Sequence, residues 1–284
     1  MDPEPESRWP QAFTFGGIAQ FGRARVGQLW IWQLVVALLA ALSLVAFVEL
    51  DWVPVVNRTI AALPESGAIQ DGKLVWPPAG PVRTAGSPFL WVSIDPTDSL
   101  EAGEGADLQL EFGPTELRAR SLFGFLHIAY PEDLVVPLNR TELEPAWGAW
   151  HPAFAVGLGA AVVLGLMLAW WCLGLIYAWP IRLIAFYADR QLTWAGSWRV
   201  GAACLLPGAL FFVAAMVAYT FNQINLLQFL GATALHLMIG WLYVLFAPFA
   251  LTSRMAAKPN GSRRGNPFGG SPRKASNPFA GPRK

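Results

Sequence analysis

Four apolar runs constrain this chain more than any other feature, because each is long enough to cross a lipid bilayer as a helix. A hydrocarbon core about 30 Å thick needs about 20 apolar residues in a helix. The runs cover residues 26–48, 149–178, 200–221 and 226–251. A helix satisfies its own backbone polar groups in lipid. The sequence therefore predicts a membrane α-helical fold with four transmembrane helices.

Composition points the same way. Hydrophobic residues make up 54% of the 284 residues and charged residues only 14%, against a usual charged share of about 25%. The first run is too long for the apolar core of a signal peptide, and no convincing small-residue cleavage site follows it. We expect it to stay in the chain as an anchor.

The charges are segregated along the chain. Residues 51–146 hold 14 acidic and 6 basic residues, whereas the tail after Leu251 holds 8 basic residues and no acidic one. Arg23 and Arg25 precede the first run, and further arginines lie in the connection 179–199. Basic residues favour the cytoplasmic side of a membrane.

All of these basic regions lie on the cytoplasmic side of the membrane only if both termini of the chain are cytoplasmic. Residues 1–25 then form a cytoplasmic N-terminus, and residues 179–199 form a cytoplasmic interfacial loop. Trp194 and Trp198 lie four apart, so they would share one face of a short surface helix. The stretch Phe13–Phe21 either lies along the same surface or is an ordinary loop touching lipid. Alanine-, glycine- and tryptophan-rich usage favours a bacterial plasma membrane.

Residues 49–148 are predicted to form a small β-rich external domain inserted between the first two helices. Asp71-Gly72 supplies the turn of a hairpin over Ile69–Leu74. Residues 57–63 are expected to form a brief helix. Alternating apolar residues predict further strands, for a sheet of four to six, at Phe89–Asp95, Asp107–Phe112, Glu116–Ser121 and Phe125–Tyr130.

A progression of short motifs runs through this segment: Pro64, then Asp71-Gly72-Lys73-Leu74, then Ile94-Asp95. Together with the layout of one span, about a hundred external residues and three more spans, it resembles an uncharacterised family of bacterial four-span membrane proteins. The resemblance covers residues 26–251 and leaves out the tail. It implies this architecture, and it implies no catalytic residues because the family has no assigned activity.

Small residues recur at every fourth position of the second run. A ridge of small residues lets another helix approach closely, which is how helices associate in lipid. We expect this ridge to pack against protein, either an internal helix or a second copy of the chain. Its members are Ala149, Ala153, Gly157, Ala161, Gly165 and Ala169.

Few polar residues lie within the runs. Gln33, Glu49 and His236 are the candidates for an intramembrane polar site. The alternative for His236 is a hydrogen bond to a neighbouring helix. His151 begins the second run at the level of Glu49 and Asp51, so a contact with either carboxylate would fix helix packing.

No arrangement of residues typical of an enzyme is present. Asp95 and Asp98 form a pair near a strand end, but the sequence offers no His, Cys or third carboxylate to complete a metal set. No nucleophile elbow, phosphate loop or zinc-protease motif occurs. We therefore expect a protein that is not an enzyme and uses no cofactor or metal.

The tail, residues 252–284, repeats Asn-Pro-Phe and is rich in proline, glycine and cations, which predicts a disordered basic arm. Cations near a membrane are attracted to an anionic cytoplasmic leaflet, whereas an Asn-Pro turn would present a phenylalanine to a protein partner. The candidate contact residues are Arg263, Arg264, Asn266, Pro267, Phe268, Arg273, Lys274, Asn277, Pro278, Phe279, Arg283 and Lys284.

Three functions compete. The first is a multi-pass membrane scaffold or accessory subunit that contacts an unknown membrane or cytoplasmic protein, or a second copy, through the ridge, the external domain and the tail. The second is a small transporter or channel component acting as an oligomer. The third, an enzyme at the membrane or on its outer face, lacks a catalytic constellation. No nucleic-acid partner is expected.

Overall fold

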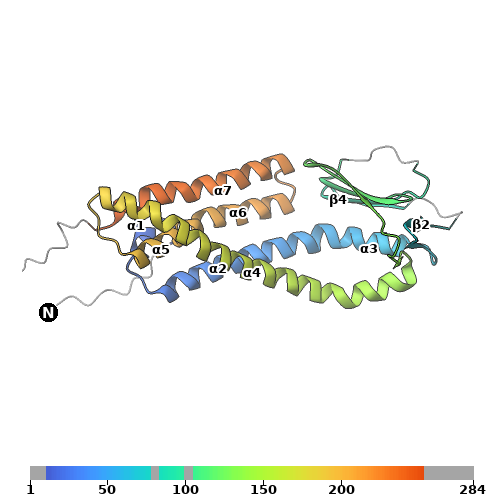
Figure 1. Cartoon of the computed structure of the whole chain (residues 1–284), viewed down its shortest axis with the longest axis horizontal. Coiled ribbons are helices and arrows are strands. Elements are labelled where there is room, and N and C mark those ends of the chain that lie inside the picture. The colour runs from blue at the N-terminus through green and yellow to red at the C-terminus, as the bar shows by residue number, and fades with distance from the viewer. Residues whose placement is uncertain (1–10, 78–82, 99–104, 253–284) are drawn as a thin grey trace, which may run out of the picture.

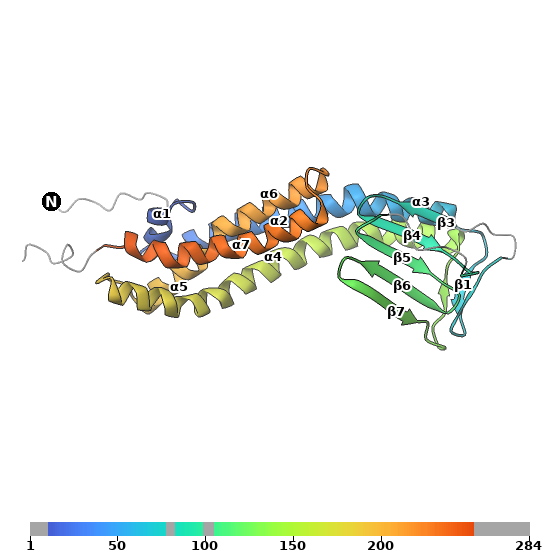
Figure 2. The same cartoon turned by 90° about the horizontal axis from the view of Figure 1, so that it is seen from above.

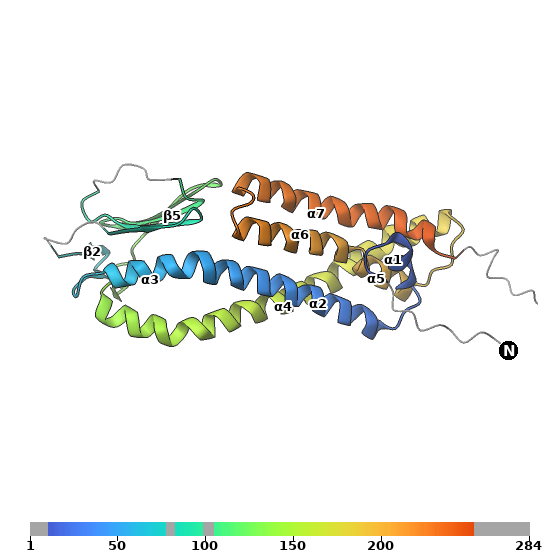
Figure 3. The same cartoon turned by 180° about the vertical axis from the view of Figure 1, so that it is seen from behind.

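The computed structural model describes residues 11–77, 83–98 and 105–252. The molecule is elongated, with a bundle of helices at one end and two β-sheets at the other (Figures 1 and 3). Two long helical segments run from the bundle to the sheets and join the two parts. The short helix α1 (Phe15–Gln20) packs at the end of the bundle away from the sheets.

The first long segment is continuous from residue 26 to residue 62. It consists of α2 (Val26–Phe47), one π-helical turn η1 (Val48–Trp52) and α3 (Val53–Ala62). Its 37 residues span about 55 Å, which exceeds the apolar thickness of a bilayer by about 25 Å. The helix predicted over residues 57–63 is therefore the end of this segment.

The second long segment is α4 (Arg140–Tyr187), with 48 residues and a length of about 72 Å. It begins nine residues before the predicted run 149–178, because Asn139 caps it: the Asn139 side chain accepts a hydrogen bond from the Glu142 amide at 2.9 Å. Hydropathy marks the apolar part of such a helix and does not mark its polar extension.

The remaining helices complete the bundle. They are α5 (Trp194–Ala203), α6 (Leu205–Thr220), α7 (Leu226–Phe246) and the short η2 (Ala247–Ala250). The third apolar helix includes α5 as well as α6, so it begins at Trp194 rather than at residue 200. The described chain thus has four helices long and apolar enough to cross a membrane, as the sequence predicts.

The smaller sheet has the strand order β2-β1-β8. Its strands are β1 (Ala68–Gln70), β2 (Lys73–Val75) and β8 (Val136–Pro137), all antiparallel. Asp71 and Gly72 join β1 to β2 with positive φ angles of 53° and 70°. A two-residue hairpin turn of this kind favours Asp-Gly, and the predicted hairpin is confirmed.

The larger sheet has the strand order β3-β4-β5-β6-β7. The strands predicted from alternation are confirmed as β4 to β7, and only the β4–β5 pair is parallel in the described sheet. The bounds are β3 (Arg83–Gly86), β4 (Leu90–Ile94), β5 (Leu108–Phe112), β6 (Glu116–Ser121) and β7 (Gly124–Ala129).

The two faces of the larger sheet differ in polarity because neighbouring residues of a strand point to opposite sides. One face packs on α3, where buried Val55 contacts Leu90 and Val92. The opposite face carries acidic and basic side chains, including Glu111 and Arg118, which lie directly across the β5–β6 pair. The sheet is therefore amphipathic, with its apolar side toward the long helices.

The sheet is attached to the helix bundle at one end. The Tyr219 hydroxyl at the end of α6 donates a hydrogen bond to the Asp107 carboxylate, just before β5, at 2.5 Å. Phe89, just before β4, packs edge-on against Tyr219 and against Phe47 of α2. These contacts fix the position of the larger sheet relative to the ends of α2 and α6.

Candidate functional site

The small-residue ridge lies on an open face of α4. All six ridge residues are exposed, and a side chain added at Gly157 or Gly165 would meet no atom within 4 Å. Gly159 lies off the ridge and faces α2 instead, where an added Cβ would lie 3.6 Å from Val45. In the described part of the chain, no helix packs on the ridge.

Part of the ridge lines a large apolar groove. Ala161, Gly165 and Ala169 form one wall, and α2, α6 and α7 form the others, around a volume of about 710 Å³. Most of the other lining side chains are also apolar, and Ser43, Tyr177 and His236 bring the polar groups. The groove is therefore suited to an apolar occupant.

The three predicted intramembrane polar residues do not form one site. Gln33 is buried in α2, and its side-chain nitrogen makes no hydrogen bond within the described residues. Glu49 lies 16 residues further along the same helical segment, which is about 24 Å. His236 lines the groove beside Phe212 and bonds through Nδ1 to the carbonyl of Thr233 on its own helix.

Glu49 instead pairs with His151 of α4. The His151 Nε2 atom lies 2.9 Å and 3.1 Å from the two Glu49 carboxylate oxygens. Glu49 belongs to the π-helical turn, which inserts an extra residue into the helix and re-aims its side chains. Nearby, the Trp147 indole donates to the Asn57 side chain at 2.8 Å. The two contacts hold α4 against the first segment, the packing role expected from the sequence.

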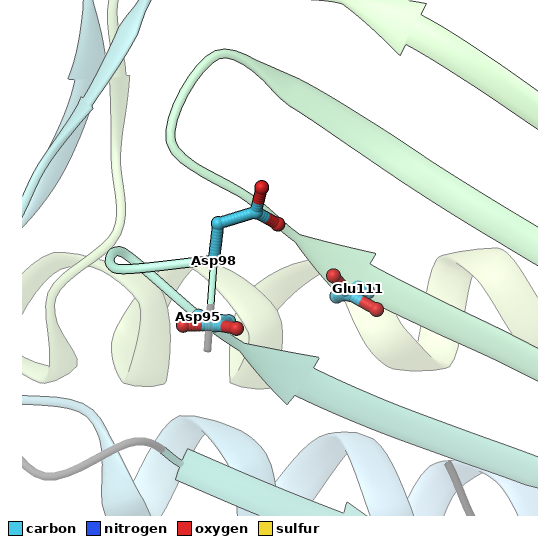
Figure 4. A group of neighbouring side chains, drawn as sticks. All are labelled: Asp95, Asp98 and Glu111. Carbon is cyan, nitrogen blue, oxygen red and sulfur yellow. The ribbon is translucent and has the colours of Figure 1, made fainter. Parts of the chain in front are cut away.

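Three carboxylates meet on the polar face of the larger sheet. Asp95, Asp98 and Glu111 each place an oxygen within 4.8 Å of the others, and Figure 4 shows their side chains gathered at the ends of β4 and β5. The prediction that no third carboxylate joins Asp95 and Asp98 was wrong. Glu111 was missed because the parallel β4–β5 register, which brings Glu111 opposite Ser93, joins strands separated by a long connection.

Arginines neutralise this cluster. Arg118 donates hydrogen bonds to Asp98, Glu111 and Glu116, at 2.5, 2.9 and 2.8 Å, and Arg120 pairs with Glu111 at 3.2 Å. His127 bonds to the same Glu116 oxygen that Arg118 contacts, at 2.8 Å. A cation bound here would have to displace the Arg118 guanidinium. The geometry is that of an ion-pair network that joins β5, β6 and β7.

This network predicts acid sensitivity of the sheet. The hydrogen bond from Arg118 lowers the pKa of Asp98 below its usual 3.8 and that of Glu116 below its usual 4.5. Because the folded-state pKa values are depressed, this stabilisation is complete above about pH 5 and is lost as pH falls through 4.5 and below. We expect the melting temperature, followed by near-ultraviolet circular dichroism, to be level from pH 7 to 5 and to fall below pH 4.5. A melting temperature that rises below pH 4.5 would contradict this assignment.

The candidate residues of the tail, from Arg263 to Lys284, lie outside the described residues. They stay a prediction from sequence. No family model, curated protein or solved structure matches this chain. The resemblance to a four-span bacterial family therefore also stays a prediction.

Proposed function

We propose that this chain is a multi-pass membrane scaffold or accessory subunit that binds a transmembrane helix of a partner on the open face of α4. Both termini face the cytoplasm, and the sheets lie outside a bacterial plasma membrane. The basic residues flanking the first, third and fourth helices support this orientation. The external domain and the basic tail provide further contact surfaces.

The observation that carries this proposal is the uncovered ridge of α4. Three of its six small residues line a groove with mostly apolar walls, and the others continue the same face toward the sheets. Small residues allow close backbone approach between helices in lipid. A helix from another protein, or from a second copy, would fill the space that the described helices leave open.

Crosslinking in native membranes tests this function. Replacing Gly157 and Gly165 together with leucine should reduce the crosslinked complex at least about tenfold, because branched side chains would hold the partner helix away from the ridge. The matched control is Ala160→Leu, an exposed position of α4 outside the ridge. Alanine at Gln33 or His236 should leave the complex in place.

The reverse pattern would overturn the proposal. If the double leucine variant keeps the complex while His236→Ala and Gln33→Ala abolish the cellular phenotype, then polar chemistry rather than packing is the function. The mass of the crosslinked species separates the two kinds of partner, since a second copy gives twice the mass of the chain.

The tail is proposed to contact anionic lipid of the cytoplasmic leaflet through its cations, or a cytoplasmic protein through Phe268 and Phe279. A pull-down of the full chain separates these roles. If Phe268→Ala with Phe279→Ala leaves the captured set unchanged while replacing the tail lysines and arginines with glutamine empties it, the tail is an electrostatic tether. The opposite result assigns a protein ligand.

The alternative of a transporter or channel component has less support. A water-filled path needs polar or charged side chains along its length. Among the described residues that line the groove, Ser43, Tyr177 and His236 bring the polar groups, and most of the others are apolar. This groove favours an apolar occupant over a solute.

A further inference from the structure

The apolar face of the larger sheet extends beyond the helices that cover it. The strand register places Leu110, Ala119 and Leu126 in one row across β5, β6 and β7 on this face. The next row runs through Leu117 and ends at Ile128. On the edge strand β7, Leu126 is 57% exposed and Ile128 is 47% exposed. The covering helix α3 lies under β3 and β4, whereas β6 and β7 project sideways beyond it (Figure 2).

An apolar groove lies between this face and the two long helices. Its volume is about 440 Å³, which is within the range of about 300–1,000 Å³ typical of pockets for small ligands. Val92, Leu110 and Phe112 line it from the sheet, and Ile60 and Ala146 line it from α3 and α4. This groove is separate from the one along the α4 ridge.

The groove offers almost nothing to a polar ligand. No charged side chain is among the described residues that line it. The Thr59 hydroxyl in its wall already donates to the Val55 carbonyl at 2.9 Å, and the Trp147 indole N–H donates to Asn57. A polar group placed here would lose its hydrogen bonds to water without replacement. The groove therefore favours an apolar occupant.

One end of the groove meets the part of the chain that enters the membrane. Trp147 and Trp150 line this end, and Trp150 is 72% exposed. The next residue, His151, pairs with Glu49 at the start of the apolar run of α4. Phe154 extends the same aromatic strip by one helical turn. Aromatic side chains thus follow α4 from the groove toward its long apolar run.

The hairpin between β6 and β7 lies at the end of the larger sheet nearest the helix bundle. Its turn residues Leu122 and Phe123 are 60% and 78% exposed, although tight turns favour polar residues and glycine. They lie at the end of the sheet that also carries Asp107, which bonds to Tyr219 at the end of α6. The hairpin turn accordingly points back toward the bundle (Figure 2). In a bilayer that surrounds the helix bundle, the exposed Leu122 and Phe123 would face the membrane surface.

We propose that this groove binds an acyl chain of a membrane lipid, which enters from the outer leaflet between Trp150 and the Leu122–Phe123 turn. The inference rests on the proposed orientation of the sheets outside the membrane. The bilayer supplies the ligand because the wall of the groove, α4, is itself a membrane-crossing helix. Burial of apolar surface drives binding, and the headgroup stays in the interfacial region, where the described groove places no charged partner for it.

A photoactivatable lipid tests the site. The full chain is reconstituted in phosphatidylcholine vesicles that contain phosphatidylcholine with a diazirine at the end of one acyl chain, and the crosslinked residues are mapped by mass spectrometry. Wild type should give crosslinks on β4, on β5 and around Ala146, besides those on the transmembrane helices. Ala146→Trp fills the groove and should reduce the sheet crosslinks at least about fivefold. Val156→Trp, at an exposed position of α4 that does not line the groove, should leave them unchanged.

Crosslinks on the transmembrane helices alone would overturn the inference, and so would sheet crosslinks that persist undiminished in folded Ala146→Trp. Far-ultraviolet circular dichroism checks the fold of each variant, and Leu110→Phe serves as a second groove-filling variant if Ala146→Trp does not fold. A groove covered by a second copy would give no lipid adduct at Ala146, which also overturns it. If crosslinks on the sheet are absent but crosslinks on the transmembrane helices persist in every variant, the protein is still inserted in the membrane. That result overturns the lipid site and leaves the scaffold function, which is tested by the Gly157 and Gly165 variants, untouched.

Discussion

Replacing Gly208 with leucine is expected to separate α6 from α7 and to unfold the bundle at a much lower temperature. A Cβ atom at Gly208 would lie 2.4 Å from the backbone carbonyl oxygen of His236, and this atom cannot move without its helix. Overpacking of this kind costs about 3 kcal/mol or more when the backbone must shift. The melting temperature in detergent should fall by roughly 6–12 °C.

Gly231→Leu is the matched control for this prediction. Gly231 belongs to α7, as His236 does, but a Cβ atom there would meet nothing within 4 Å. Its melting temperature should stay within about 2 °C of wild type, since a surface substitution changes stability by about 0.5 kcal/mol at most. Equal losses in both variants would show that the close α6–α7 contact at Gly208 is not the cause of the destabilisation.

Replacing Arg118 with alanine is expected to have the next largest effect, through the larger sheet. Glu111 is only 6% exposed and would lose the guanidinium that bonds to it at 2.9 Å. Leaving a buried carboxylate without its partner costs about 2 kcal/mol after allowance for the remaining Arg120 contact. The melting transition of the sheet, followed by near-ultraviolet circular dichroism, should fall by roughly 4–8 °C. The acid sensitivity described above should weaken in the same variant.

Arg140→Ala removes an ion pair of ordinary exposed type and serves as the control. Arg140 bonds to Glu144 one turn along α4, at 2.9 Å, with both side chains more than half exposed. Pairs of this kind contribute about 0.3–0.5 kcal/mol. If Arg140→Ala and Arg118→Ala destabilise the protein equally, the network on the sheet has no special role.

The sequence predicts the helices and strands of this protein well because their signals are local. Hydropathy locates the four long helices, and alternation locates β4 to β7. The Asp71-Gly72 pair locates the β1–β2 turn, since few other residues accept two positive φ angles in succession. Hydropathy misses the polar extension of α4, and the local signal for its start is Asn139 followed three residues later by Glu142.

The arrangement of these elements depends on contacts between residues distant in the chain. Glu111 joins Asp95 and Asp98 only because β4 and β5 pair in parallel, and no local pattern reports that pairing. The ridge on α4 is visible in the sequence, but its exposure depends on how obliquely α4 crosses the bundle (Figure 1). The apolar groove depends likewise on how β4 and β5 lie over α3 and α4.

The proposed placement of the sheets outside the membrane underlies both the proposed scaffold function and the proposed lipid site. It is tested most directly by labelling two single cysteines, introduced as Glu132→Cys and Tyr187→Cys into a chain with Cys172→Ser and Cys204→Ala. Glu132 is exposed in the connection after β7, beside the sheets. Tyr187 is exposed at the C-terminal end of α4, in the helix bundle. In right-side-out vesicles, a membrane-impermeant maleimide should label the cysteine at 132 and leave the one at 187 unlabelled until the vesicles are lysed. Labelling of position 187 alone before lysis would contradict the account.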